Sequence, residues 1–273
     1  MLLNLKTIHK PETEAEALAL LTQQGTFPLY GGAALQRHPR PAVEAAIDLS
    51  RLGLDRAAKD GDALRLGSMM TLERARQTCL ERGDPHPLLG GLARALKEDL
   101  PETLRHTFTL GDLLVERDPQ SVTLTLLLAL DARIAVAGAE EMLSVAGWLA
   151  SGDAAWRALV THVSVPRGPA QAAVVFEKVA RTPADAPIVG AVAAAWADGK
   201  ARHTGLALCG VAPWPLAQPE AARLFDKTDD MDAALDALDL DPPDDHWGSR
   251  EYRAEMARVL TRRVLTEVAE AMK

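Results

Sequence analysis

The chain has 273 residues, of which 48% are hydrophobic and 25% charged, and its formal net charge is −8. This length and composition are typical of a globular protein of about two domains, and they exclude a disordered or fibrous chain. The negative charge, without a long run of Lys or Arg, argues against binding to nucleic acid. The longest apolar runs are shorter than the roughly 20 residues of a membrane-spanning helix. Since the N-terminus also lacks the pattern of a secretion signal, we expect a cytoplasmic protein without a membrane span.

Residues for metal or catalytic chemistry are scarce. The two cysteines, Cys79 and Cys209, are too few for a zinc site, an iron–sulfur cluster or a disulfide framework. The seven histidines stand at no metal-ligand spacing. The hydrolase Gly-x-Ser-x-Gly motif, the P-loop and the Gly-x-Gly-x-x-Gly fingerprint are missing. We therefore expect no metal ligands and no catalytic residues, and any redox centre must be organic.

The N-terminal part has the pattern of a small mixed fold. Apolar residues at helical spacing predict a helix over Glu14–Gln23, and Gly25 follows its end. Two apolar runs, Phe27–Tyr30 and Ala45–Ser50, flank a glycine-rich loop and predict strands. The expected order is strand, helix, strand, loop and strand.

The middle of the chain mixes helices and strands. Its expected elements are a strand at Leu64–Gly67, a helix capped by Thr71 that ends near Leu80, and a helix over Leu88–Leu100 ended by Pro101. Thr109–Gly111, taken alone, predicts only a strand and a turn. After a turn at Asp118–Ser121, the periodicity of Thr123–Leu130 fits a helix or a strand equally well.

The last third predicts an α+β domain. We expect a linker at Ser151–Pro169, because it contains two prolines and a glycine near its end. Asp198-Gly199, between the apolar segments Ile188–Ala197 and Lys200–Val211, is a strong hairpin signal. Helical periodicity follows in Glu220–Phe225, Met231–Leu238 and Arg250–Met272, the last beginning at Ser249 with Tyr252, Met256, Val259, Leu260 and Val264 on one face.

Several segments stand in an order known from one protein family. Leu29–Leu35 is similar to a flavin loop written Ala-Gly-Gly-Thr-Asp-Leu, and Arg105–Leu113 takes the place of a second loop, Arg-Asn-x-Gly-Thr-Ile-Gly-Gly-Asn. Further matching segments are Asp48–Ser50, Leu66–Thr71, Asp118–Ser121, Leu127–Ala132, Phe176–Arg181 with Asp185, and Ser249–Arg253. Together they resemble the FAD-binding, or medium, subunit of the molybdenum hydroxylase family, of the carbon monoxide dehydrogenase flavoprotein type.

The resemblance implies a fold and a domain division. We expect an α+β protein with a two-lobed FAD-binding domain of the vanillyl-alcohol-oxidase type over residues 1–165, with subdomains of about 1–55 and 56–165. A smaller α+β domain with an antiparallel sheet, like the C-terminal domain of the carbon monoxide dehydrogenase flavoprotein, is expected over 170–273.

The resemblance also implies FAD as the cofactor. Paired glycines let backbone N–H groups approach a pyrophosphate closely, because no Cβ blocks the approach. The implied cofactor-binding residues are Gly31, Gly32, Leu35, Thr109, Gly111 and Lys178. The chain would relay electrons from iron–sulfur clusters to an acceptor, in complex with an iron–sulfur subunit and a molybdopterin subunit of an oxidoreductase.

Four residues depart from the family's pattern at these loops. They are Ala33, Asp112, Leu113 and Val122. A carboxylate at Asp112 would face the pyrophosphate and repel it, and the other three changes each remove a polar group. The alternative function is therefore a flavin-free structural subunit that keeps the fold and the docking surfaces.

Overall fold

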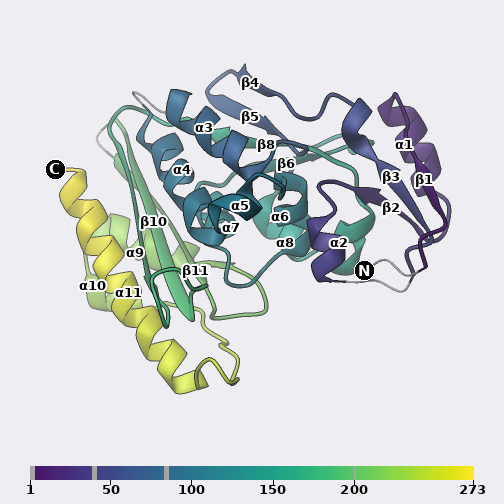
Figure 1. Ribbon diagram of the computed structural model, residues 1–273. Coiled ribbons are helices and arrows are strands. Elements are labelled where there is room, and N and C mark those ends of the chain that lie inside the picture. The colour runs from purple at the N-terminus through teal and green to yellow at the C-terminus, as the bar shows by residue number, and fades with distance from the viewer. Residues whose placement is uncertain (1–3, 39–41, 83–85, 200) are drawn as a thin grey trace.

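Three β-sheets organise the chain in this computed structural model, which describes residues 4–38, 42–82, 86–199 and 201–273. Two of the sheets and most of the helices form one part of the molecule, and the third sheet with its long C-terminal helix forms the other (Figure 1). Within the described ranges, no helix combines the length and the apolar character needed to cross a bilayer.

A small parallel sheet forms the N-terminal lobe. Its strands are β1 (Thr7–His9), β3 (Ala45–Asp48) and β2 (Thr26–Leu29), in that spatial order. Its helices are α1 (Glu14–Leu21), α2 (Ala33–Arg37) and the 3-10 helix Leu49–Arg51. The predicted order of strand, helix, strand, loop and strand is confirmed, and α2 adds a short helix inside the expected loop.

The second lobe is built on a five-stranded sheet in the order β4-β5-β8-β6-β7. Its strands are β4 (Ala57–Asp60), β5 (Ala63–Gly67), β6 (Arg133–Val136), β7 (Leu143–Ser144) and β8 (Val160–Pro166). Its helices are α3 (Leu72–Arg82), α4 (Pro87–Asp99), α5 (Glu102–Arg105), α6 (Leu110–Glu116), α7 (Val122–Ala129), α8 (Val145–Leu149) and the 3-10 helix Gly152–Arg157. The predicted helices at Thr71–Leu80 and Leu88–Leu100 correspond to α3 and α4.

The prediction of a linker at Ser151–Pro169 is wrong. This segment contains the 3-10 helix and β8, which pairs with both β5 and β6 in the interior of the five-stranded sheet. Val160, Val163 and Val165 are almost completely buried. The prolines and the glycine lie only at the end of this strand. They do not indicate irregular structure over the whole predicted segment.

Two ambiguous segments in the middle are helical. Val122–Ala129 forms α7, where the Ser121 hydroxyl accepts the Leu124 N–H at 3.0 Å and thereby caps the helix. Thr109 makes an isolated bridge with Thr71 and then caps α6, so the expected strand and turn at Thr109–Gly111 is replaced by a helix start. Since α7 is buried on all sides, its sequence carries no amphipathic signal.

An antiparallel sheet with the order β12-β11-β10-β9 forms the second part of the molecule. Its elements are β9 (Ala172–Val179), β10 (Val189–Asp198), β11 (Ala201–Cys209), β12 (Leu216–Ala217), α9 (Pro219–Thr228), α10 (Met231–Asp236) and α11 (Arg250–Ala271). The predicted hairpin is confirmed as β10 and β11, although Lys200 lies outside the described residues.

Helix α11 begins at the predicted cap, because the Ser249 hydroxyl accepts the Tyr252 N–H. Leu260 and Val264 face the core as expected, but Tyr252 is 41% exposed. Arg253 takes the inward position instead and donates to the carbonyl oxygens of Ile188 and Gly210. A buried guanidinium that binds backbone carbonyls is not visible in a hydrophobic pattern.

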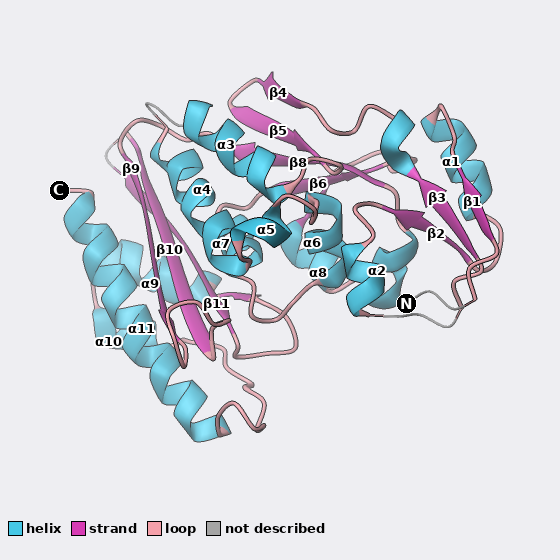
Figure 2. Cartoon of the chain, viewed as in Figure 1, coloured by secondary structure: helices cyan, strands magenta, loops and turns pink. Residues whose placement is uncertain are grey.

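Helices lie on both faces of the antiparallel sheet (Figure 2). Val192 and Ala194 of β10 belong to the core of the first part, whereas Ala191 and Ala193 belong to the core under α11. Small residues make the packing close: a Cβ at Gly205 of β11 would lie 1.8 Å from the carbonyl oxygen of Ala129 in α7. The two parts therefore have separate hydrophobic clusters that meet at this sheet.

Candidate functional site

Two loops that are far apart in the sequence meet at the end of β2. Gly31 and Gly32 connect β2 to α2, and Gly32 has a positive φ of 81°, which favours glycine. The second loop leads into α6, where Thr109 is the capping residue. The Gly31 N–H donates to the Thr109 hydroxyl at 3.3 Å, so the predicted convergence of the two loops is present.

The carboxylate of Asp112 lies at the junction of these loops. One of its oxygens accepts the N–H of Gly31 at 2.9 Å, together with the N–H and the hydroxyl of Thr109 at 3.1 and 3.0 Å. The other oxygen accepts the Ala34 N–H at 3.1 Å. Asp112 is only 2% exposed. Burial raises the pKa of this carboxyl, against the hydrogen bonds, which lower it.

Close packing around the junction depends on its glycines. A Cβ at Gly31 would lie 2.3 Å from an Asp112 carboxylate oxygen and 2.6 Å from the Thr107 carbonyl oxygen. A Cβ at Gly111 would lie 2.1 Å from the ring of Tyr30. The Gly111 amide is also engaged, because its N–H donates to the Ser68 carbonyl at 2.7 Å. At both glycines, the place that a Cβ would take is therefore occupied by other groups of the protein.

Tyr30 links the first loop to the five-stranded sheet. Its hydroxyl donates to the Ala158 carbonyl at 2.9 Å and accepts the Val160 N–H at 2.8 Å. Burial raises the pKa of this phenol. Tyr30 stands where the family's loop has alanine, so its ring fills space next to Gly111 that a methyl group would leave open.

A second buried carboxylate, that of Asp99, holds the start of α7. It accepts the Ser121 hydroxyl at 2.7 Å and the N–H groups of Val122 and Thr123 at 2.7 and 3.1 Å. Burial raises the pKa of Asp99 to about 6, although these hydrogen bonds lower it. Sequence reasoning missed Asp99, because its partners are 22–24 residues away and form no local motif.

A small cavity lies beside Asp99. Its volume of about 30 Å³ corresponds to about one water molecule. It is lined by Arg37, Glu98, Asp99, Leu100, Phe108, Leu113, Glu116, Asp118, Gln120, Ser121, Ala186 and Pro187. Phe108 and Leu113 in its wall are only 3% and 4% exposed.

The remaining predicted site residues lie apart from the junction. Leu35 of α2 is 3% exposed and packs in the hydrophobic core. Lys178 on β9 forms an ion pair with Glu98 at 2.9 Å and donates to the Asp185 carbonyl at 3.3 Å. Glu98 lines the small cavity, so Lys178 reaches its border only through this carboxylate.

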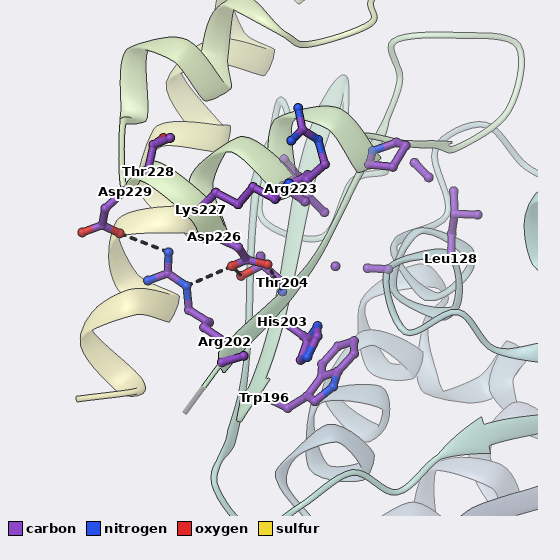
Figure 3. Close-up of a pocket in the computed structure, with 17 residues that line it drawn as sticks. Leu128, Trp196, Arg202, His203, Thr204, Arg223, Asp226, Lys227, Thr228 and Asp229 are labelled. Carbon is purple, nitrogen blue, oxygen red and sulfur yellow. Dashed lines mark hydrogen bonds and ion pairs between the residues drawn. The ribbon is translucent and has the colours of Figure 1, made fainter. Parts of the chain in front are cut away.

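A large depression lies elsewhere, between β11, α9 and the end of α7 (Figure 3). Its volume is about 920 Å³, and none of the predicted site residues lines it. Arg202 in its wall is paired with Asp226 and Asp229, both at 3.0 Å. Trp196 and His203 stack in its floor with ring centroids 6.3 Å apart. It is therefore not the site indicated by the glycine loops.

Four N–H groups of the loop junction are already engaged and are not free to hold a flavin pyrophosphate. Those of Gly31, Ala34 and Thr109 donate to Asp112, and that of Gly111 donates to the Ser68 carbonyl. A phosphate at the same place would meet a buried carboxylate of like charge, which is unfavourable at short range. The ring of Tyr30 occupies the space next to Gly111.

Comparison with known proteins covers nearly the whole chain. Residues 4–168 match the family model of the FAD binding domain in molybdopterin dehydrogenase, and residues 174–268 match that of the CO dehydrogenase flavoprotein C-terminal domain. The carbon monoxide dehydrogenase medium chain of Afipia carboxidovorans is 28% identical to this chain, in an alignment that covers 94% of both chains. The uncharacterized protein YgfM of Escherichia coli K12 is 32% identical over 54% of both chains.

Two solved structures have the same fold over 98% of both chains. A chain of the reconstituted CO dehydrogenase from Oligotropha carboxidovorans superposes with a TM-score of 0.83 at 24% identity. A chain of quinoline 2-oxidoreductase from Pseudomonas putida 86 superposes with a TM-score of 0.79 at 22% identity. The similarity extends through both parts of the molecule.

Proposed function

Because the chain belongs to the family of FAD-binding medium subunits of molybdenum hydroxylases, we propose that it is the medium subunit of an oxidoreductase complex of this type. Its partners in this proposal are an iron–sulfur subunit and a molybdopterin subunit. The observation that carries the proposal is the match to both family models in the expected order, over 4–168 and 174–268. We place its domains at 1–165 and 170–273, and the two matches support this division.

The contacts of the glycine loops favour a subunit that does not use flavin chemistry. In the cofactor-binding members of such a family, loop N–H groups must be open to the pyrophosphate; here they donate to the buried carboxylate of Asp112. The ring of Tyr30 occupies the space next to Gly111 of the second loop. We therefore infer that this chain contributes a folded scaffold to its complex without binding FAD at these loops.

Electron relay through FAD is the second candidate function. The family match over 4–168 and the retained Gly31-Gly32 pair favour it. In this case the Asp112 carboxylate would have to leave the loop junction, and Gly31, Gly32, Thr109 and Gly111 would hold the pyrophosphate. Lys178 would stay at the border of the site through Glu98. FAD, when bound, supplies the redox chemistry, and the protein supplies binding and orientation.

Co-expression with candidate iron–sulfur and molybdopterin subunits tests both functions. If the docking proposal holds, the three chains elute together from a sizing column with stoichiometric iron and molybdenum, and the visible spectrum shows no flavin. Stoichiometric FAD released from the same complex on denaturation would favour the relay instead. If the chain elutes alone when the partners assemble without it, both candidates fail.

A variant separates the two candidates further. Asp112→Gly with Leu113→Asn restores the residues that the family's second loop has at these positions. We expect this variant to bind FAD at least tenfold more tightly than the parent, because a buried carboxylate and a bulky side chain are removed. Fluorescence quenching of FAD measures this ratio, with Asp230→Gly as a control for removal of one carboxylate. Tight binding by the parent would contradict the docking role.

A further inference from the structure

The depression between β11, α9 and the end of α7 has the size of a site for a small organic molecule. Its volume of about 920 Å³ lies within the range of roughly 300–1,000 Å³ that is usual for ligand pockets. Leu128, Leu206 and Ala222 contribute apolar surface from α7, β11 and α9. None of the described residues that line it belongs to the glycine loops, so it is a separate feature of the molecule.

An aromatic surface forms the floor of this depression. Trp196 of β10 and His203 of β11 are cross-strand partners, so their side chains lie on the same face of the sheet. The two rings are stacked, with an angle of 22° between their planes (Figure 3). A nucleobase can stack on such a surface whatever its sequence of ring atoms, because every base has a π-face.

The edge of β11 adds a backbone acceptor beside the floor. β12 pairs with β11 only at Ala207 and Leu208, so the edge of residues 201–205 is open to the depression. The Thr204 N–H points to this edge and donates to the Asp226 carboxylate at 2.7 Å. Since the N–H and C=O of one strand residue point to the same side, the Thr204 carbonyl also faces the edge. It can accept a hydrogen bond from an amino or hydroxyl group of a ligand.

Of the described residues, five charged side chains line the depression, three cations and two carboxylates. Arg202 pairs with both carboxylates, those of Asp226 and Asp229, at 3.0 Å each. Asp226 also accepts the Thr204 hydroxyl at 2.6 Å. Both carboxylates thus have partners within the protein, and the remaining two charges are cations of α9.

The α9 cations are Arg223 and Lys227, which lie four residues apart and therefore on the same face of the helix. Arg223 pairs with Glu220, which is exposed and outside the lining, and an exposed pair of this kind contributes little. Lys227 takes part in none of the ion pairs that the described residues form, although its charge attracts Glu220 from a longer distance. The two side chains are therefore available to bind an anion at α9.

We propose that this depression binds a nucleoside 5′-monophosphate, with its base on Trp196 and His203 and its phosphate at Arg223 and Lys227. The rings belong to the sheet and the cations to α9, and Figure 3 shows them apart. A ligand that contacts both needs a spacer between its ring and its anion, and the ribose is such a spacer. The site needs no partner subunit and is independent of the proposed function.

Isothermal titration calorimetry of the full-length chain with AMP tests the proposal. We expect a submillimolar dissociation constant for AMP. Adenosine, which lacks the phosphate, and ribose 5-phosphate, which lacks the base, should each bind at least about tenfold more weakly. Added sodium chloride should weaken the binding of AMP but not that of adenosine, because the phosphate contacts are exposed. If AMP, GMP, CMP and UMP all fail to bind, the proposal is overturned.

Two variants assign the two ends of the ligand. Lys227→Gln should weaken AMP about tenfold and leave adenosine unchanged, whereas Trp196→Ala should weaken both about tenfold. If Trp196→Ala does not fold, His203→Ala replaces it, since His203 is exposed, and the same result is expected. Lys59→Gln removes an exposed lysine of β4 outside the depression and is the matched control, which should bind AMP as the parent does.

AMP is also a part of FAD, so these variants distinguish the depression from the glycine loops. Equal affinity of the parent, Lys227→Gln and the ring variant for AMP would place the ligand elsewhere and overturn the proposal. Equal affinity of the parent for AMP and ribose 5-phosphate would also overturn it, because the aromatic floor would then contribute nothing.

Discussion

The hydroxyl of Tyr30 is the group whose removal most directly tests the link between the glycine loop and the five-stranded sheet. Tyr30→Phe keeps the ring beside Gly111 and removes both hydrogen bonds, to the Ala158 carbonyl and from the Val160 N–H. Val160 is completely buried, so its N–H would have no acceptor. Losing both hydrogen bonds, with one N–H left unpaired in the core, costs about 2–4 kcal/mol.

For a chain of this size, that loss corresponds to a melting temperature roughly 5–10 °C below the parent. The only other tyrosine in the sequence, Tyr252, is 41% exposed and provides the control. Tyr252→Phe should change the free energy of unfolding by less than about 0.5 kcal/mol. Differential scanning calorimetry of the three proteins measures both effects.

A second measurement uses the pKa of the same phenol, which burial raises. In Tyr252→Phe, Tyr30 is the one remaining tyrosine, and ultraviolet titration should show tyrosinate only when the protein unfolds at alkaline pH. The reasoning is refuted if Tyr30→Phe is as stable as Tyr252→Phe, or if Tyr30 ionises in the folded chain near the ordinary tyrosine pKa.

Three other perturbations follow from individual contacts. Gly91→Ala should lower the free energy of unfolding by roughly 1–3 kcal/mol in urea titrations, because its Cβ would lie 2.6 Å from Val174 Cβ. A Cβ at Gly90 in the same helix would meet no atom, so Gly90→Ala should raise the free energy of unfolding by roughly 0.5–1 kcal/mol. Hydrogen bonds from Arg76 and Arg105 hold the pKa of Glu73 at about 2. Glu73→Gln should therefore cost about 3 kcal/mol near neutral pH, and the deficit should shrink as pH falls from about 4.5 towards 2. Burial raises the pKa of Asp99 to about 6, so the folded state binds this proton more tightly than the unfolded state, and the stability decreases as pH rises from about 4 to 6. Asp99→Asn should remove this decrease from the free energies of unfolding measured across the range. An unchanged pH profile of stability would contradict the assignment.

Local sequence patterns predicted the elements that depend on nearby residues. Thr71, Ser249 and the Asp198-Gly199 turn each mark an element boundary through short-range chemistry, and the structure has the boundaries where these residues stand. The ordered matches to one family predicted the convergence of the two glycine loops. These features could be predicted because their signals lie within a few residues or in the order of segments.

Contacts between distant segments could not be predicted in this way. Asp112 was expected to face and repel a phosphate, and nothing in the local pattern indicated that its carboxylate would bind the N–H groups of Gly31 and Ala34. Likewise, β8 was interpreted as linker, because its pairing with β5 joins residues about a hundred positions apart. In both cases the deciding partner lies in another part of the chain.

The antiparallel sheet between two cores has a consequence for how the chain folds. Alternate residues of β10 complete different cores, so a fragment cut near residue 168 would expose the faces of α4 and α7 that Val174 and Val192 cover. A fragment that begins near residue 170 would expose the face of the antiparallel sheet that carries Val174 and Val192. The two halves therefore unfold as one cooperative unit, and the chain should show a single melting transition. Substitutions in the glycine loops can alter what the loops hold without removing any residue of this shared sheet.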